Sequence, residues 1–263
     1  MIGMDQVKEM VLNTLMTGRL KNGYIVSLIL LATPESGKTS VVNSVNSKNL
    51  AVYTDITGKG LLDTIKTHSE LSHIVLNDLT IASAHSKKAS AYFFAILGAA
   101  TEEGIKSVAD PGGTSNYDMR RGAIICTTID FIHDKRRTWM KNGLSSRFLP
   151  FCFSHSAKLQ LKVLESINGH DKAIELKPAE TIMPSSMIEV KITRDQLFQC
   201  ERMALIVAKE NQELGYRRKK QFMSLVMGRA LRKTWKNPCV NKSDIEWLES
   251  IQKFISWENA HEI

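Results

Sequence analysis

Residues 24–40 read Tyr-Ile-Val-Ser-Leu-Ile-Leu-Leu-Ala-Thr-Pro-Glu-Ser-Gly-Lys-Thr-Ser: an apolar segment, a short loop and then Gly37-Lys38-Thr39. The pattern G-x-x-x-x-G-K-[ST], launched from a strand and followed by a helix, is typical of a loop that binds phosphate groups. Backbone N–H groups of the loop and the positive end of the helix dipole attract the anion. Residues 41–45 suit the helix that must follow, so a chance match in a surface turn explains the stretch less well.

Two polar side chains at the end of this loop have expected roles in binding a nucleotide. Lys38 reaches the β- and γ-phosphates of ATP, and the Thr39 hydroxyl holds Mg²⁺. Ala32 stands where the pattern has its first glycine, and alanine enters the region of positive φ less readily. The loop residues expected to contact the nucleotide are Ala32, Pro34, Glu35, Ser36, Gly37, Lys38, Thr39 and Ser40.

The composition of the 263-residue chain is that of an ordinary globular protein, with 43% hydrophobic and 24% charged residues. The longest apolar run, 25–32, is far shorter than the ~18 residues of a membrane-spanning helix, and the first residues have no signal-peptide pattern. The four cysteines have no metal-binding spacing, so we expect reduced thiols. We therefore expect a cytoplasmic protein, in the host cytoplasm if it is viral, with no membrane partner. Its net charge of +8 permits a polyanionic partner.

Apolar and helical segments alternate along the first 160 residues, which predicts a parallel sheet with helices on both faces. Beyond the first strand, strands are expected at 49–56, 72–78, 122–128 and 148–153. Helices are expected at 4–18, 61–65 and 86–103. The stretch 104–118 contains glycine and proline and predicts a loop or a hairpin.

The character of the chain changes after residue 157, where helical segments dominate. They are expected at 157–168, 195–214, 217–234 and 243–257. Ser243 is the expected N-cap of the last one, with Glu246 completing a capping box. The predicted fold class is therefore α/β, with a parallel-sheet P-loop NTPase core at 1–160 and a C-terminal helical lid at 161–263.

Polar residues follow the buried strand 72–78, where Mg²⁺-binding and water-activating acids are expected. Asp78 can ligate the metal directly or through water, whereas Asn77 cannot act as a general base. The alternative is a simple turn at the end of the strand, because Asn and Asp favour turns. Glu102 and Glu103 are weaker candidates for a replacement base. The pattern predicts nucleotide binding and argues against rapid hydrolysis.

Two further side chains complete the candidate site. Thr127 ends the fourth predicted strand, which we expect between the first and the third, and there it can orient the attacking water. Arg147 precedes the fifth strand, at a corner from which an arginine finger can reach the γ-phosphate bound by a neighbouring subunit. The alternative for Arg147 is an ordinary surface salt bridge.

Taken in order, these features resemble the AAA+ branch of P-loop ATPases, and the resemblance covers almost the whole chain. It rests on the loop 32–39, Asn77-Asp78, Thr127, the run 144–148 and the helical lid. The run 144–148 and the lid are similar to those of minichromosome-maintenance helicases and related replication ATPases. The size of the chain suits a phage or a mobile element.

The resemblance implies additional site residues. Arg217 falls at the position of the family's second sensor arginine, which contacts the nucleotide, and Arg218 is the neighbouring alternative. In ring ATPases of this branch, an insert before the fourth strand points into the pore and grips the DNA backbone; here the insert is 104–121. The residues that would contact DNA phosphates are Lys106, Arg120 and Arg121.

The expected function is that of an AAA+ ATPase that binds ATP and Mg²⁺ at the subunit interfaces of a homo-oligomer. The assembly is expected to be a ring or a helix, with a hexamer as the expected size. It would act on DNA without sequence preference in replication or remodelling, as a helicase-like motor or a helicase loader with a replication protein as partner. A protein-remodelling chaperone is one alternative, although Tyr117 is the only aromatic residue of the insert. A nucleotide-gated scaffold with weak hydrolysis is the other, and Asn77 favours it.

Overall fold

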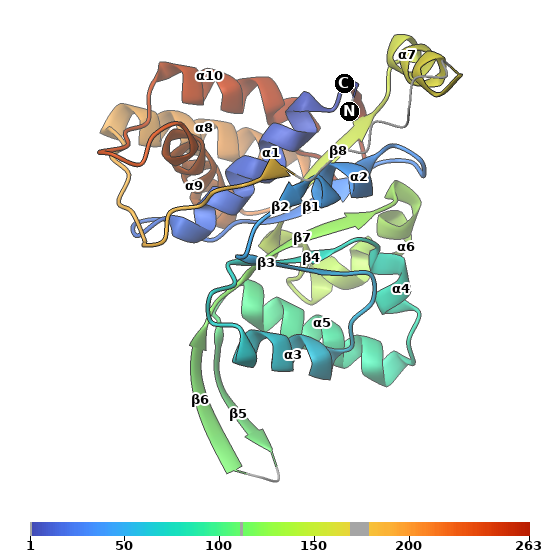
Figure 1. Ribbon diagram of the computed structural model, residues 1–263, viewed down its shortest axis with the longest axis vertical. Helices are drawn as coiled ribbons and strands as arrows, with labels where there is room; N and C mark the ends of the chain where they lie inside the picture. Colours follow the sequence, from blue (N-terminus) through green and yellow to red (C-terminus); the bar gives the residue numbers. More distant parts are fainter. Residues whose placement is uncertain (1, 111–112, 169–178) are drawn as a thin grey trace.

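The computed structural model describes residues 2–110, 113–168 and 179–263, and a six-stranded parallel sheet forms its centre (Figure 1). The strand order is β10-β8-β1-β7-β4-β3. All five predicted strands are present, and β7 lies between β1 and β4 as expected. The strands of the sheet are β1 (Ser27–Leu31), β3 (Leu50–Tyr53), β4 (His73–Leu76), β7 (Gly122–Thr127), β8 (Phe148–Ser154) and β10 (His261–Glu262).

The central strands are apolar on both faces because helices cover both faces of the sheet. All five residues of β1 are buried, and they alternate between two hydrophobic clusters. Leu28 and Leu30 pack into the cluster on one face, whereas Ile29 and Leu31 pack into the other. This alternation fixes the register of β1, since a shift by one residue would exchange the two faces.

The first face of the sheet is covered by the N-terminal helix, the helix after the loop and the three lid helices. They are α1 (Asp5–Met16), α2 (Lys38–Asn43), α8 (Arg194–Glu210), α9 (Tyr216–Lys233) and α10 (Lys242–Ile251). Helix α9 approaches α1 closely at Gly228, where a Cβ atom would lie 2.6 Å from the Asn13 carbonyl oxygen. The lid helices and the sheet share one hydrophobic cluster, so the lid is packed on the core and does not stand apart from it.

The second face is covered by helices α3, α5 and α6, with the short α4 at the edge (Figure 1). Their bounds are α3 (Gly58–Thr67), α4 (Leu79–Ser83), α5 (Lys87–Thr101) and α6 (Ile129–Lys141). Aromatic side chains fill this layer, including Phe93, Trp139 and Phe148. Helix α7 (Ala157–Asn168) follows β8 and has the bounds predicted from the sequence.

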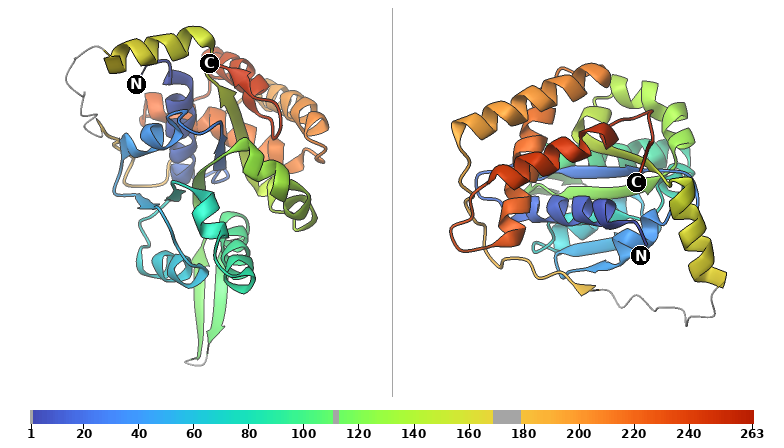
Figure 2. Two further views of the ribbon diagram at one scale, coloured as in Figure 1. Left: turned by 90° about the vertical axis from the view of Figure 1, so that its right-hand side faces the viewer. Right: turned by 90° about the horizontal axis from the view of Figure 1, so that it is seen from above.

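Strands β5 (Ile105–Asp110) and β6 (Gly113–Met119) form an antiparallel hairpin. The hairpin projects away from the rest of the molecule (Figures 1 and 2). The hairpin alternative for the Gly- and Pro-containing stretch is therefore confirmed. The side chains of 106–118 lie outside the described part of the structure, and with them the predicted contact of Lys106 and the side chain of Tyr117.

Three features of the C-terminal part differ from the prediction. The last helix begins after Asn241, whose side chain accepts a hydrogen bond from the Asp244 backbone N–H at 3.3 Å, so the N-cap is not Ser243. The helix ends at Ile251, and after a 3₁₀ turn the chain returns to the sheet as β10, beside β8. Two-residue strands β2 (Val45–Asn46) and β9 (Ala179–Glu180) also pair. The division into 1–160 and 161–263 stays a prediction.

No helix in the described ranges combines the length and the apolar character that crossing a membrane requires.

Candidate nucleotide-binding site

The predicted phosphate-binding loop connects β1 to α2, as the pattern requires. Gly37 has φ of 77° and serves as the N-cap of α2, a conformation that favours glycine. The second residue with positive φ is Glu35, at 61°. Ala32 is buried and does not have positive φ, so the loop takes its left-handed conformations at later positions. The missing first glycine is thus compatible with the loop.

Lys38 lies at the centre of the loop, where its ammonium group has three oxygen acceptors. It donates hydrogen bonds to the carbonyl oxygens of Ala32 at 2.9 Å and Thr33 at 2.7 Å, and to Ser36 Oγ at 3.0 Å. Burial lowers the pKa of Lys38, while the nearby Asp78 carboxylate acts in the opposite direction. A bound triphosphate would replace these neutral acceptors by charged oxygens, which form stronger hydrogen bonds.

The metal-binding candidates lie at the carboxyl ends of the strands, next to this loop. Thr39 Oγ1 is 3.5 Å from the Asn77 carbonyl oxygen, so Thr39 and the end of β4 are neighbours. Asp78 caps α4: its Oδ1 accepts hydrogen bonds from the Thr80 backbone N–H at 2.8 Å and the Thr80 hydroxyl at 2.7 Å. Its Oδ2 has no hydrogen bond among the described residues. Asp78 therefore lies in the turn after β4, as the alternative interpretation held, and keeps one carboxylate oxygen for a metal.

Two buried polar atoms at the same edge of the sheet, Asn77 Oδ1 and Thr127 Oγ1, have no hydrogen-bond partner in the part of the chain that the structure describes. Strands β4 and β7 are adjacent, with Leu76 opposite Ile125, so these atoms end neighbouring strands. Most buried polar groups in native structures have a partner, and a bound ligand or water can supply one for these two atoms. The edge thus fits ATP with Mg²⁺: Thr39 and Asp78 would hold the ion, and Thr127 and Asn77 would contact water or phosphate.

No group of three or more His, Cys, Asp or Glu side chains suited to a metal occurs among the described residues.

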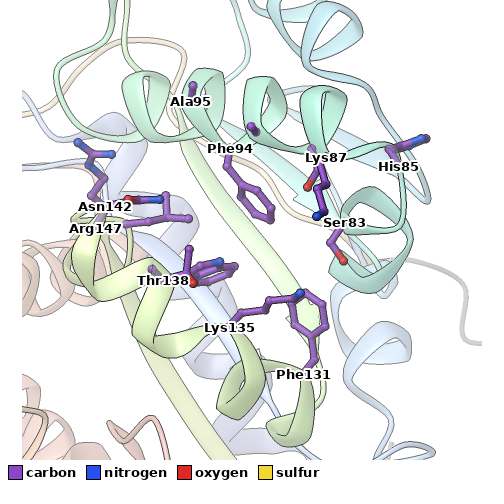
Figure 3. Close-up of a pocket in the computed structure, with 14 residues that line it drawn as sticks. Ser83, His85, Lys87, Phe94, Ala95, Phe131, Lys135, Thr138, Asn142 and Arg147 are labelled. Carbon is purple, nitrogen blue, oxygen red and sulfur yellow. The ribbon is translucent and has the colours of Figure 1, made fainter.

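Arg147 lies at the opposite edge of the sheet from the loop. It ends a 3₁₀ turn, and the next residue, Phe148, pairs with Ser27 at the beginning of β1, whereas the loop follows the end of β1. At about 3.3 Å per residue the length of β1 separates them by roughly 15 Å or more. Arg147 lies at the end of a groove of about 570 Å³ between α5 and α6, into which Phe94 points (Figure 3).

Arg217 lies beside Arg147 and not at the loop of its own chain. Glu102 forms ion pairs with both arginines, and Arg217 also donates a hydrogen bond to the Ser146 hydroxyl. The prediction that Arg217 contacts the nucleotide can therefore apply only to a nucleotide held by a neighbouring subunit. The alternative, Arg218, is fully buried and bonded to Glu213, so it is not available to a phosphate.

Glu102 cannot serve as the replacement base that the sequence suggested. It follows α5, at the edge of the sheet opposite the loop, and both its carboxylate oxygens bind arginines. Glu103 is exposed beside it, at the same edge of the sheet and equally remote from the loop, so it is not the base either. The sequence around Glu102 does not indicate this ion pairing, because Arg147 and Arg217 lie 45 and 115 positions further along the chain.

The two arginines at the base of the hairpin differ in their contacts. The Arg120 guanidinium lies over the Tyr24 ring, 3.5 Å from its centroid. Arg121 is buried, and it donates hydrogen bonds to the carbonyl oxygens of His68 at 3.4 Å and Ser69 at 3.3 Å. Burial lowers the pKa of Arg121. The predicted phosphate contact of Arg121 is therefore corrected: the side chain joins the hairpin to the end of α3.

The strand order, the loop between β1 and α2 and the polar edge beside it define the fold of a P-loop nucleoside triphosphatase with a helical lid. No protein-family model and no curated protein matches the sequence. The solved structure of a candidate ATPase from Cytophaga hutchinsonii is similar in fold, with a TM-score of 0.53 and 12% sequence identity. The similarity covers 97% of this chain and 82% of that chain. The predicted fold class is confirmed.

Proposed function

We propose that the chain is an ATPase that completes its active site between subunits of a homo-oligomer. One subunit would contribute Lys38, Thr39 and Asp78, and the next would contribute Arg147 and Arg217. The observation that carries the proposal is the separation of these two groups on opposite edges of one sheet. The similarity in fold to a candidate ATPase supports the general activity.

Each residue has a role that follows from its chemistry. Mg²⁺ would neutralise phosphate charge between Thr39 and Asp78. Lys38 and Arg147 would stabilise the charge that gathers on the γ-phosphate in the transition state. Thr127 would orient the attacking water. Asn77 can hold a water but cannot take its proton, so we expect slow hydrolysis.

We further propose a homo-oligomeric ring or helix that acts on DNA, as a helicase-like motor or a helicase loader. The projecting hairpin and the net charge of +8 support a polyanionic partner. Binding would be electrostatic, without sequence preference. The nucleotide-gated scaffold is the second candidate, and Asn77 in place of an acid favours it.

Stimulation of ATP hydrolysis separates the candidates. DNA should stimulate a motor or a loader, and an unfolded protein client should stimulate a chaperone. A scaffold should respond to neither. Absence of affinity for single- and double-stranded DNA at low salt would contradict the role on DNA.

The subunit-interface site is tested by mixing two inactive variants. Arg147→Ala should bind ATP with nearly unchanged affinity but lose hydrolysis by about 10³-fold or more, because an arginine finger contributes that much. Lys38→Ala should also be inactive. In the mixture, some interfaces pair an intact loop with an intact Arg147, so part of the activity should return. Hydrolysis is measured as phosphate release over a range of protein concentrations.

The matched control is Arg137→Ala, which removes an exposed arginine of α6 and should leave hydrolysis unchanged. A rate per subunit that does not depend on protein concentration, together with no recovery in the mixture, would contradict the proposal.

A further inference from the structure

Glu102 joins three elements that are distant in the sequence. It is the C-cap of α5. Its Oε2 accepts a hydrogen bond from Arg147 Nε at 2.6 Å, in the turn before β8. Its Oε1 forms an ion pair with Arg217, in the first turn of the lid helix α9. One carboxylate therefore connects the core and the lid at the position of both arginines.

The way in which Arg147 is held leaves its terminal nitrogens available. Glu102 binds the Nε atom, and neither Nη1 nor Nη2 has a hydrogen-bond partner among the described residues. The surface of α5 makes room for the guanidinium at Gly98, where a Cβ atom would lie 2.4 Å from Arg147 Nη1. The carboxylate and the glycine together fix the orientation of the group.

The negative charge of the Glu102 carboxylate offsets the repulsion between Arg147 and Arg217. Two guanidinium groups beside one another repel, and Glu102, whose side chain is 16% exposed, lies between them. Burial acts to raise the pKa of Glu102, but the hydrogen bond from Arg147 and the positive charge of Arg217 outweigh it and lower the pKa. The group is therefore ionised at neutral pH and attracts both arginines.

We propose that Glu102 is a positioning residue for ATP hydrolysis: it holds Arg147 and Arg217 as one unit that presents the terminal nitrogens of Arg147 to the neighbouring subunit's γ-phosphate. This inference rests on the proposed subunit-interface active site. A preorganised donor stabilises the transition state without reorganisation, and a displacement of about 1 Å can cost about 100-fold in rate.

The test is Glu102→Gln, which keeps the shape of the side chain but removes its charge. The kcat for ATP should fall by about 100-fold. The KM for ATP should stay within about twofold, because the subunit's own loop lies at the other edge of the sheet. Glu103→Gln, at the exposed neighbouring position, is the matched control and should hydrolyse ATP like the wild type.

Mixing experiments separate a positioning role from a structural one. Glu102→Gln mixed with Lys38→Ala should regain activity, because the second variant supplies an intact Arg147. Glu102→Gln mixed with Arg147→Ala should not, because both variants lack a positioned arginine.

Gly98→Ala is the second variant: alanine favours the helix, yet its methyl group would displace Arg147, so the same loss of kcat is expected.

Four results overturn the inference. Wild-type kcat in Glu102→Gln would show that the carboxylate positions nothing, and a raised kcat would show that it restrains the arginines instead. Recovery of activity with Arg147→Ala as partner would place the defect elsewhere. If Arg147→Ala and Lys38→Ala also fail to complement each other, the proposed interface site falls, and the role of Glu102 falls with it. If that pair complements and Glu102→Gln is fully active, only the role of Glu102 falls.

Discussion

Lys38 is the residue on which nucleotide binding depends. It has three neutral oxygen acceptors in the loop, and a triphosphate would offer it charged ones. Lys38→Ala should weaken ATP binding by at least about 100-fold, equivalent to about 2.7 kcal/mol. Isothermal titration calorimetry measures the affinity, and circular dichroism verifies the fold.

Lys48→Ala, at an exposed position after the same helix, is the control and should bind ATP like the wild type. Equal affinity of Lys38→Ala and the wild type would remove the loop from the binding site.

At the residue scale, the sequence predicts the position of a side chain where that position depends on residues nearby in the chain. Lys38, Thr39 and Asp78 lie where the strand–loop–helix pattern and the strand end predict them. Arg121 and Glu102 do not have the predicted roles, because their partners come from distant segments. Their charges indicate neither that Arg121 is buried against carbonyl oxygens nor that Glu102 lies between two arginines.

Helix α9 allows a comparison of a buried and an exposed ion pair on adjacent residues. The Arg218 side chain is 0% exposed and binds Glu213, whereas Lys219 is 39% exposed and binds Glu201. Arg218→Ala should lower the free energy of unfolding by about 3–5 kcal/mol, because it leaves the Glu213 carboxylate largely buried without its partner. Lys219→Ala should cost less than about 1 kcal/mol.

Urea unfolding followed by circular dichroism measures both values. Similar losses for the two variants would show that the Arg218 pair is no more important to stability than a surface pair.

At the element scale, helices with a regular apolar face were predictable, and α7 has the predicted bounds. The first residue of α10 could not be predicted, since both Asn241 and Ser243 can cap a helix. Asp244 decides between them: Arg229 and Lys233 of α9 hold its Oδ1, while its Oδ2 accepts from the Asn241 backbone N–H at 2.9 Å. Contacts from another helix thus place the cap.

At the scale of the whole molecule, a buried histidine should make stability depend on pH. His73 begins β4, is fully buried and contacts the Val26 carbonyl oxygen at 3.0 Å through Nε2. Glycine is required beside it, because a Cβ atom at Gly122 would lie 2.3 Å from the ring. Burial lowers the pKa of His73 from 6.5 to about 4.

Between these two values the unfolded chain binds a proton at His73 and the folded chain does not. The free energy of unfolding should therefore fall as the pH drops from 6.5 toward 4, by on the order of 3 kcal/mol from this group. Urea unfolding at pH 7.5 and pH 5.0 measures the part of this change that lies above pH 5.0, about 2 kcal/mol. His73→Asn should be less stable at pH 7.5 and should depend less on pH. An equal pH dependence in the variant would contradict the assignment.

The architecture followed from the alternation of apolar and helical segments, which is a property of the whole chain. The position of the lid helices did not follow from this alternation. Its helices lie in the same hydrophobic cluster as α1 and the sheet, and α9 begins beside the turn that carries Arg147. Helical periodicity shows that a helix has an apolar face, but not which layer that face meets.

The pairing of β10 with β8 has a consequence for the order in which the protein can be completed during synthesis. Strand β8 leaves the ribosome before the three lid helices, whereas β10 follows them. Domains generally begin to fold while translation continues. The outer edge of β8 at Phe153 and Ser154, the two residues that pair with β10, therefore stays unpaired until the lid has been made, and an unpaired strand edge can pair with another chain. A nascent chain that stalls inside the lid would leave this edge exposed, which favours association with another chain before β10 is translated.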